Sequence, residues 1–390
     1  MDSSAHSART FLAALTLLVI GATLVFTLSP FDFSWPSTAR FRWQTNFSDA
    51  SSNVILFIPL GFLLRLLREE SPPRLFLPEL ALAAGLSFLI EFAQLYLASR
   101  HSQYSDVLCN AAGAWLGAWL AHLTGARLSP TSDSGPSACA SSPLYGLILA
   151  TPVLWLYGFD QDLRNHLFIP SMLLALAGCI AISAFTTCLV QERRDITPAA
   201  ASLFTMGWVL TAFFPFLRSH AVAVLWSALL LGLFSYLFTR HLARRERPIR
   251  IGQWLVPLVL LHLAATLPFQ ADAIHTTWHW NLNLVPLLER DHGVHLVGQM
   301  MLFLLLGYFR GAAGEPPGRK LLLRGITASL LPLTLLLLVG GFLSHSPFSL
   351  VELPLLSFSL AYGVMLDALR AQATAFADTG PMALAPMESR

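Results

Sequence analysis

The chain has 390 residues, of which 55% are hydrophobic and only 12% are charged, and its mean hydropathy is +0.61. Soluble globular proteins carry about 25% charged residues, so this composition excludes an ordinary soluble fold. Neither the net charge of +2 nor any basic block indicates a nucleic-acid partner.

Apolar runs of membrane-spanning length recur along the whole chain, beginning with the run from Phe11 to Leu28. That run follows Arg9 and lacks a small-residue cleavage site, which indicates a retained helix rather than a signal peptide. We count about twelve spans, beginning near Phe11, Val54, Leu75, Val107, Leu144, Leu167, Ala199, Ala221, Gln253, Val294, Leu321 and Glu352. The sequence therefore predicts an all-α, polytopic transmembrane helix bundle.

The distribution of basic residues orients this bundle. With the amino terminus inside, 18 of the 24 lysines and arginines fall on the inner side. Because basic loops are retained in the cytoplasm, this asymmetry predicts that both termini are cytoplasmic. The loop from Arg100 to Asp106 then lies outside, and Glu91 lies about two helical turns from water.

One dense polar run, EFAQLYLASRHSQYSDVLCN at residues 91–110, closes the third span and opens the fourth. An acid near the centre of a membrane helix costs roughly 2.5–3.5 kcal/mol on insertion scales, so such a cluster needs a reason. We expect a polar site at the outer end of the bundle, with Glu91 and Asp106 as catalytic candidates. The expected ligand-binding residues are Asn53, Glu91, Gln94, Arg100, His101, Asp106 and Asn110.

Structural roles compete with this interpretation. Gln94 and Asn110 are also suited to hydrogen bonds between helices, and Asp106 to the start of a helix, where the dipole favours an acid. His101 and Asn53 are also consistent with turn building and packing. Glu91 is the strongest candidate, because no structural reason for an acid is evident at that position.

A worn internal duplication predicts a parallel repeat of helices 1–4 and 9–12. The segment from Asn53 to Gly61 recurs from Gln299, and HSQYS at 101–105 recurs as HSPFS at 345–349. This second match aligns Asp106 with Leu350, which predicts that the second copy keeps the scaffold and loses the acids. The middle block, from about Leu144 to Leu242, shows no repeat and no polar cluster.

Histidines and cysteines give no firm metal site. His275, His279, His292 and His295 have spacings that suit Zn²⁺ or Cu²⁺ on a helix, but no helix is assured there. The four cysteines fit no metal or disulfide spacing, and we predict that all are unpaired. No metal or cofactor is assigned.

The residues Asn53, Pro59 and Gly61, then Glu91 and Gln94, then Arg100, Asp106, Asn110 and Gly113 form a pattern that resembles the VanZ-like family. The match covers about 24–120, with a degenerate copy at about 265–370. The resemblance implies a bacterial plasma-membrane protein of the cell envelope, in a family whose namesake is linked to low-level teicoplanin resistance. It also implies a VanZ-like four-helix unit at 1–125, a central block at 126–250, a degenerate second unit at 251–372 and a cytoplasmic tail at 373–390.

Three functions remain open. The first is a non-enzymatic envelope protein whose outer site recognises a lipid headgroup, a lipid-linked wall precursor or a glycopeptide. The second is a membrane enzyme that acts on a lipid-linked glycan or peptide, with Glu91 as acid or base and Asp106 as its ionised partner. The third is a twelve-helix transporter, although the commonest such design repeats after six helices and this chain repeats after eight. Membrane lipids are the expected partners, and the sequence gives no oligomeric state.

Overall fold

The computed structural model is all-helical apart from two isolated β-bridges. It describes residues 3–28, 33–35, 41–43, 47–68, 76–98, 100–128, 138–159, 161–192, 196–244, 252–271, 290–311 and 352–378. The first four helices are α1 (Ser3–Leu28), α2 (Phe47–Leu67), α3 (Leu77–Gln94) and α4 (Tyr104–Leu128). They are followed by α5 (Ala138–Phe159), α6 (Gln161–Glu192), α7 (Ala199–Ala212), the 3₁₀ turn η1 (Phe214–Phe216) and α8 (Leu217–Leu242). The last described helices are α9 (Gly252–Ala271), α10 (Arg290–Gly311) and α12 (Glu352–Asp378).

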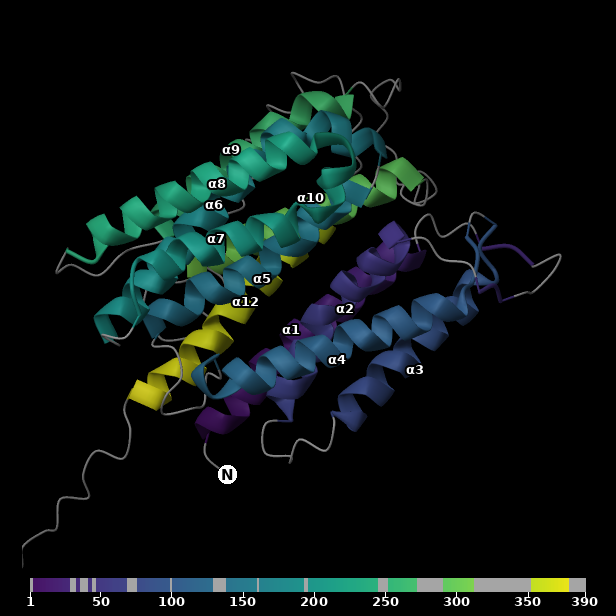
Figure 1. Ribbon diagram of the computed structural model, residues 1–390, viewed down its shortest axis with the longest axis horizontal. Helices are drawn as coiled ribbons and strands as arrows, with labels where there is room; N and C mark the ends of the chain where they lie inside the picture. The colour runs from purple at the N-terminus through teal and green to yellow at the C-terminus, as the bar shows by residue number, and fades with distance from the viewer. Residues whose placement is uncertain are drawn as a thin grey trace, which may run out of the picture.

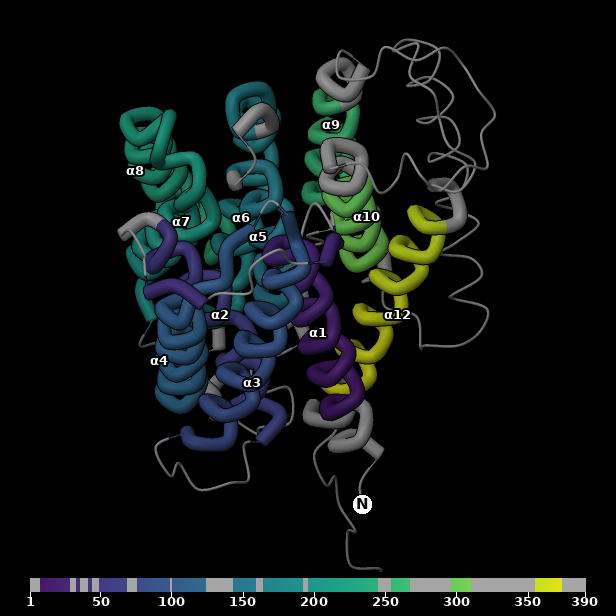
Figure 2. The backbone as a smooth tube through the Cα atoms, turned by 90° about the vertical axis from the view of Figure 1, so that its right-hand side faces the viewer, coloured from purple at the N-terminus to yellow at the C-terminus, as the bar shows by residue number. Residues whose placement is uncertain are grey.

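The helices lie side by side along one common direction (Figures 1 and 2). Helices α1 to α4 form one group, and α1 joins it to the rest of the bundle by packing against α12. The Tyr362 hydroxyl of α12 donates to the carbonyl of Ala14 in α1 at 3.1 Å. This arrangement places the polar run at one end of a four-helix unit.

Five described helical segments are long and apolar enough to cross a membrane, by length and composition. They are Ala8–Leu28, Asp49–Leu67, Leu77–Gln94, Arg164–Gln191 and Phe214–Leu242. In lipid the backbone must satisfy its own hydrogen bonds, which is why such apolar sequences form helices. Of the twelve predicted spans, the one beginning near Leu321 lies outside the described residues, and the count of twelve stays a prediction.

Helix α3 is amphipathic in the sense opposite to a soluble helix. Its buried face carries polar residues, with Glu79 and Glu91 only 1% and 2% exposed. Its exposed face carries large apolar side chains, namely Leu77, Leu82, Phe88, Leu89 and Phe92. A helix with this pattern is suited to lipid, because exposing large apolar side chains to water is unfavourable.

Helices α2 and α4 pack closely through three glycines. A Cβ atom at Gly61 would meet the backbone carbonyl of Ala114, and one at Gly113 would meet that of Val54. Gly117 faces the carbonyl of Ile58 in the same way. Small residues of this kind let two membrane helices approach each other, and the contacts hold α2 and α4 in register.

The cysteine prediction is wrong in one respect. Cys109 and Cys179 are free, as expected, but Cys188 on α6 is disulfide-bonded. Sequence spacing gave no signal for this bond, because the approach of two thiols depends on how the helices pack.

Candidate functional site

Glu91 lies in the last turn of α3, where its side chain is hydrogen-bonded to the residue that precedes α4. Its carboxylate accepts a hydrogen bond from the backbone N–H of Gln103 at 2.7 Å. The hydroxyl of Ser102 donates to the backbone carbonyl of Glu91, also at 2.7 Å. Gln103 directly precedes α4, so the acid satisfies a donor at the positive end of that helix. Glu91 therefore has a structural partner that its position in the sequence did not indicate, although an amide oxygen could accept the same hydrogen bond.

Gln94 and Arg100 close the end of α1. The side-chain amide of Gln94 donates to the carbonyl of Thr27 at 2.9 Å, and the Arg100 guanidinium donates to that of Phe26 at 3.4 Å. Helix α1 ends at Leu28, so these carbonyls belong to its last turn and have no partner within the helix. The predicted interhelical hydrogen bond of Gln94 is confirmed.

Asn110 ties α4 to α3 in the buried interior. Its side-chain amide donates to the Ser87 hydroxyl at 2.8 Å, and both residues are almost completely buried. The predicted interhelical hydrogen bond of Asn110 is confirmed as well. The Oδ1 atom of Asn110 has no hydrogen-bond partner among the described residues, so this polar contact leaves one acceptor unused.

Asn53 and Asp106 link α2 to α4 nearer the surface. The Asn53 side chain hydrogen-bonds to the Asp106 carboxylate, and Ser105 approaches the same carboxylate at 3.5 Å. Asp106 and Arg100 both act electrostatically on the Glu91 carboxyl. Arg100 and Asp106 thus lie within electrostatic range of the Glu91 carboxyl, and a shared binding site for the three groups stays a prediction.

The predicted residues differ in how accessible they are. Glu91 and Asn110 are buried, Asn53 and Asp106 are half-buried, and Arg100 and His101 are exposed. Buried members can support the arrangement of the helices, while the half-buried and exposed members remain available to a ligand at the surface. We therefore divide the cluster into a supporting layer and an accessible layer, the latter made of Asn53, Arg100, His101 and Asp106.

Part of the loop between α1 and α2 lies across this end of the unit. The Arg42 N–H donates to the Ser102 carbonyl at 3.0 Å, and the Tyr104 N–H donates to the Arg42 carbonyl at 3.1 Å. The rings of Trp35 and Trp43 contact the polar run's own tyrosines, Tyr96 and Tyr104. The two tryptophans are 87% and 72% exposed, as suits residues of a membrane interface.

The comparisons with known proteins fall on this same group of helices. Residues 4–125 match the model of the family described as VanZ/LLP1. Protein VanZ from Enterococcus faecium is 33% identical over 109 residues, which are 27% of this chain and 66% of that protein. The chain belongs to the VanZ-like family. Its VanZ-like domain comprises α1 to α4, and no solved structure matches the chain.

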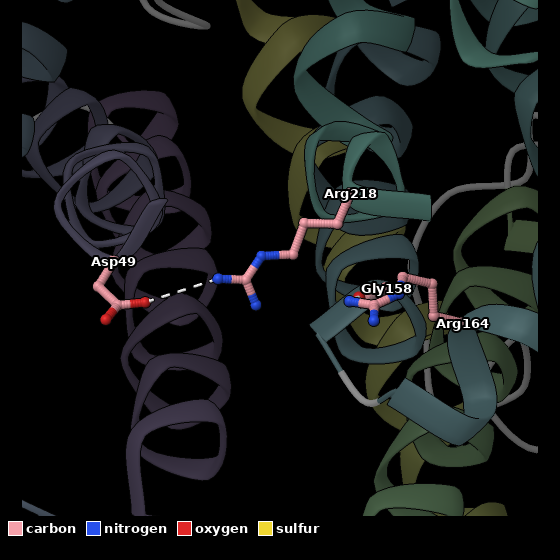
Figure 3. A network of polar contacts seen from close by, with 4 residues as sticks. All are labelled: Asp49, Gly158, Arg164 and Arg218. Carbon is pink, nitrogen blue, oxygen red and sulfur yellow. Dashed lines mark hydrogen bonds and ion pairs between the residues drawn. The ribbon is translucent and has the colours of Figure 1, made fainter. Parts of the chain in front are cut away.

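One charged contact joins the VanZ-like domain to the helices beyond it. Arg218, at the start of α8, lies 4.0 Å from the carboxylate of Asp49 in the first turn of α2 (Figure 3). Asp49 in turn acts electrostatically on Asp106. Both side chains of the ion pair are about half exposed, so it contributes at most about 1 kcal/mol. This contact could not be predicted from local sequence, because Arg218 is far from the VanZ-like domain along the chain.

A buried ion pair lies at the opposite end of the domain. Arg65 of α2 lies 3.5 Å from Glu79 of α3, and their side chains are only 8% and 1% exposed. The Phe76 ring covers the Arg65 guanidinium, with 5.5 Å from its central carbon to the ring centroid. Neither carboxylate oxygen of Glu79 accepts a hydrogen bond within the described part of the chain. This pair ties the last turn of α2 to the first turn of α3.

The histidine-rich segment lies only partly within the described residues. His275 and His279 lie outside the described residues, and His292 and His295 fall on the first turns of α10. Within the part of the chain that the structure describes, no group of three or more potential metal ligands comes together.

Proposed function

We propose that this VanZ-like protein acts in the bacterial plasma membrane as a non-enzymatic envelope protein that binds a polar ligand at its outer end. The proposed ligand is a lipid headgroup, a lipid-linked wall precursor or a glycopeptide of the teicoplanin type. The observation that supports the proposal is geometric: the exposed Arg100 and the half-buried Asp106 flank the segment whose Gln103 N–H donates to the buried Glu91 carboxylate at 2.7 Å.

The accessible layer supplies groups of both charges. Arg100 presents a guanidinium, which binds phosphate or carboxylate groups through paired N–H donors. Asp106 presents a carboxylate, held by Asn53, that accepts hydrogen bonds from a hydroxyl or amine. A headgroup or precursor that carries an anion beside hydroxyl or amine groups matches this set.

The surrounding loop favours a ligand that enters from the membrane surface. Trp35 and Trp43 are largely exposed beside the site, and such rings prefer the headgroup layer. A ligand anchored in the same layer would reach Arg100 and Asp106 without leaving the membrane.

Binding of purified protein in nanodiscs tests this proposal. The probes are a lipid-linked disaccharide pentapeptide and teicoplanin, and the measurement is microscale thermophoresis. We expect saturable binding of at least one probe by the wild type, weakened about tenfold or more by Arg100→Gln or Asp106→Asn. Arg68→Gln, an exposed arginine just beyond the inner end of α2, is the matched control. If neither probe binds saturably, or if all variants bind alike, the proposal is wrong.

The electrostatic effect of Asp106 on the Glu91 carboxyl favours an enzyme as the second candidate. Two interacting carboxyl groups in different environments can serve as acid and base. Incubation of the same lipid-linked precursor with the protein separates the two functions. Product formation that Asp106→Asn abolishes would favour catalysis, whereas binding without product favours recognition.

A further inference from the structure

The glycine contacts between α2 and α4 recur between α10 and α12. In the first pair, Gly61 faces the carbonyl of Ala114, and Gly117 faces the carbonyl of Ile58 and the N–H of Phe62. These contacts fix which residue of α4 lies opposite which residue of α2. They therefore define the register of the helix pair.

The second pair repeats the same set of contacts. Gly307 faces the carbonyl of Leu360, and Gly363 faces the carbonyl of Leu304 and the N–H of Tyr308. Each of these residues lies 246 positions beyond its counterpart (307 against 61, 360 against 114, 363 against 117, 304 against 58 and 308 against 62). A constant offset on both helices means that α10 and α12 pack in the register of α2 and α4.

This register corrects the alignment made from the sequence. The HSQYS and HSPFS motifs give an offset of 244, which pairs Asp106 with Leu350. The helix contacts pair Asp106 with Glu352 instead, and they agree with the pairing of Asn53 with Gln299 that the first motif predicts. The amide thus corresponds to an amide and the carboxyl to a carboxyl, each longer by one methylene. The prediction that the second copy loses its acids is wrong at this position.

The neighbours of the pair are not kept. At either offset, Glu91 corresponds to a leucine (Leu335 or Leu337) and Arg100 to a serine (Ser344 or Ser346). A pair without the guanidinium lacks the contact for an anion, but retains acceptors for N–H or O–H donors. Gln299 is half-buried, as is Asn53, so the two amides occupy similar depths in their helix pairs.

We propose that α9, α10 and α12 belong to a second VanZ-like unit in which Gln299 and Glu352 form a second polar site. This site takes a lipid headgroup that carries an ammonium or hydroxyl donor, and it does not require an anionic group. The ligand class rests on the proposed function of the first site, whereas the pairing of residues 299 and 352 rests on helix register alone.

Disulfide trapping tests the pairing. Cys109 and Cys179 are replaced by serine. A protease site is inserted between residues 312 and 319, or between residues 69 and 75 for the reference pair, so that a cross-link holds the two fragments together. We expect Gln299→Cys with Glu352→Cys to cross-link, as should the reference pair Asn53→Cys with Asp106→Cys. Gln299→Cys with Leu350→Cys should not cross-link, because the register of α10 and α12 puts residue 352, not residue 350, at the position that corresponds to Asp106. A cross-link from 350 instead of 352, or from neither while the reference pair reacts, would overturn the proposal.

Native mass spectrometry tests the ligand class. The probes are phosphatidylethanolamine, whose ammonium donates hydrogen bonds, and phosphatidylcholine, whose headgroup nitrogen has no N–H. We expect the wild type to retain the ethanolamine lipid preferentially and Glu352→Gln to reduce that preference, by up to about tenfold for a charged hydrogen bond. An unchanged preference in Glu352→Gln would overturn the second site. Failure of the first site would appear in a different measurement. In that case Arg100→Gln and Asp106→Asn would bind the precursor and the glycopeptide as the wild type does.

Discussion

Replacement of Glu91 separates its structural role from a role in binding. Glu91→Ala leaves the N–H of Gln103 without its acceptor at the start of α4. Hydrogen bonds to charged groups contribute about 1.5–3 kcal/mol, and an unsatisfied buried donor costs a similar amount. We therefore expect Glu91→Ala to lower the free energy of unfolding by about 2–3 kcal/mol. Glu91→Gln keeps an acceptor for the same N–H, so it should lose about 1 kcal/mol or less.

The assay is unfolding in bicelles by increasing dodecyl sulfate, followed by tryptophan fluorescence, together with probe binding at a concentration where each variant is folded. Asp49→Asn, which removes a half-exposed carboxylate at the start of α2, serves as the control and should change stability by less than about 1 kcal/mol. If Glu91→Gln is stable but no longer binds, the carboxylate charge serves the ligand. If Glu91→Ala is as stable as the wild type, the Gln103 hydrogen bond does not support α4 and the reasoning is refuted.

Three further substitutions probe the packing that holds the site. Gly113→Ala places a methyl group against a backbone carbonyl of α2 and should lower the free energy of unfolding by about 1–3 kcal/mol. The control Gly85→Ala, where nothing lies within 4 Å, should be neutral or slightly stabilising. Equal stability of the two variants would contradict the close contact. Glu79→Gln removes the charged partner of Arg65 in a buried ion pair and should cost about 3–5 kcal/mol in the same unfolding assay. A loss below about 1 kcal/mol would show that the pair is hydrated. Arg218→Gln removes only a half-exposed ion pair, so its effect on stability should stay below about 1 kcal/mol and vanish in high salt; a larger, salt-independent loss would mean that this arginine has a further partner.

Local sequence explains why Glu91 and Asp106 come close together, but it does not explain which partners they have. Glu91 and Asp106 lie on consecutive helices joined by a short loop, so their convergence follows from chain connectivity. The role of Glu91 does not follow from it. Its acceptor interaction with the Gln103 N–H depends on how the loop turns back onto α3, and no periodicity in the sequence reports that turn.

The sequence by itself determined the helices, because apolar runs in lipid must satisfy their backbone hydrogen bonds within each segment. It also determined the family and the end of the unit at which the polar residues gather. Only the tertiary structure decided which partners those residues have: Gln94 and Arg100 with the end of α1, and Arg218 with Asp49. It alone set the register of α12 against α10, which differs by two residues from the motif alignment. The physical reason is that helix formation depends on local hydrogen bonds, whereas side-chain partners and register depend on how one helix is rotated and shifted against another.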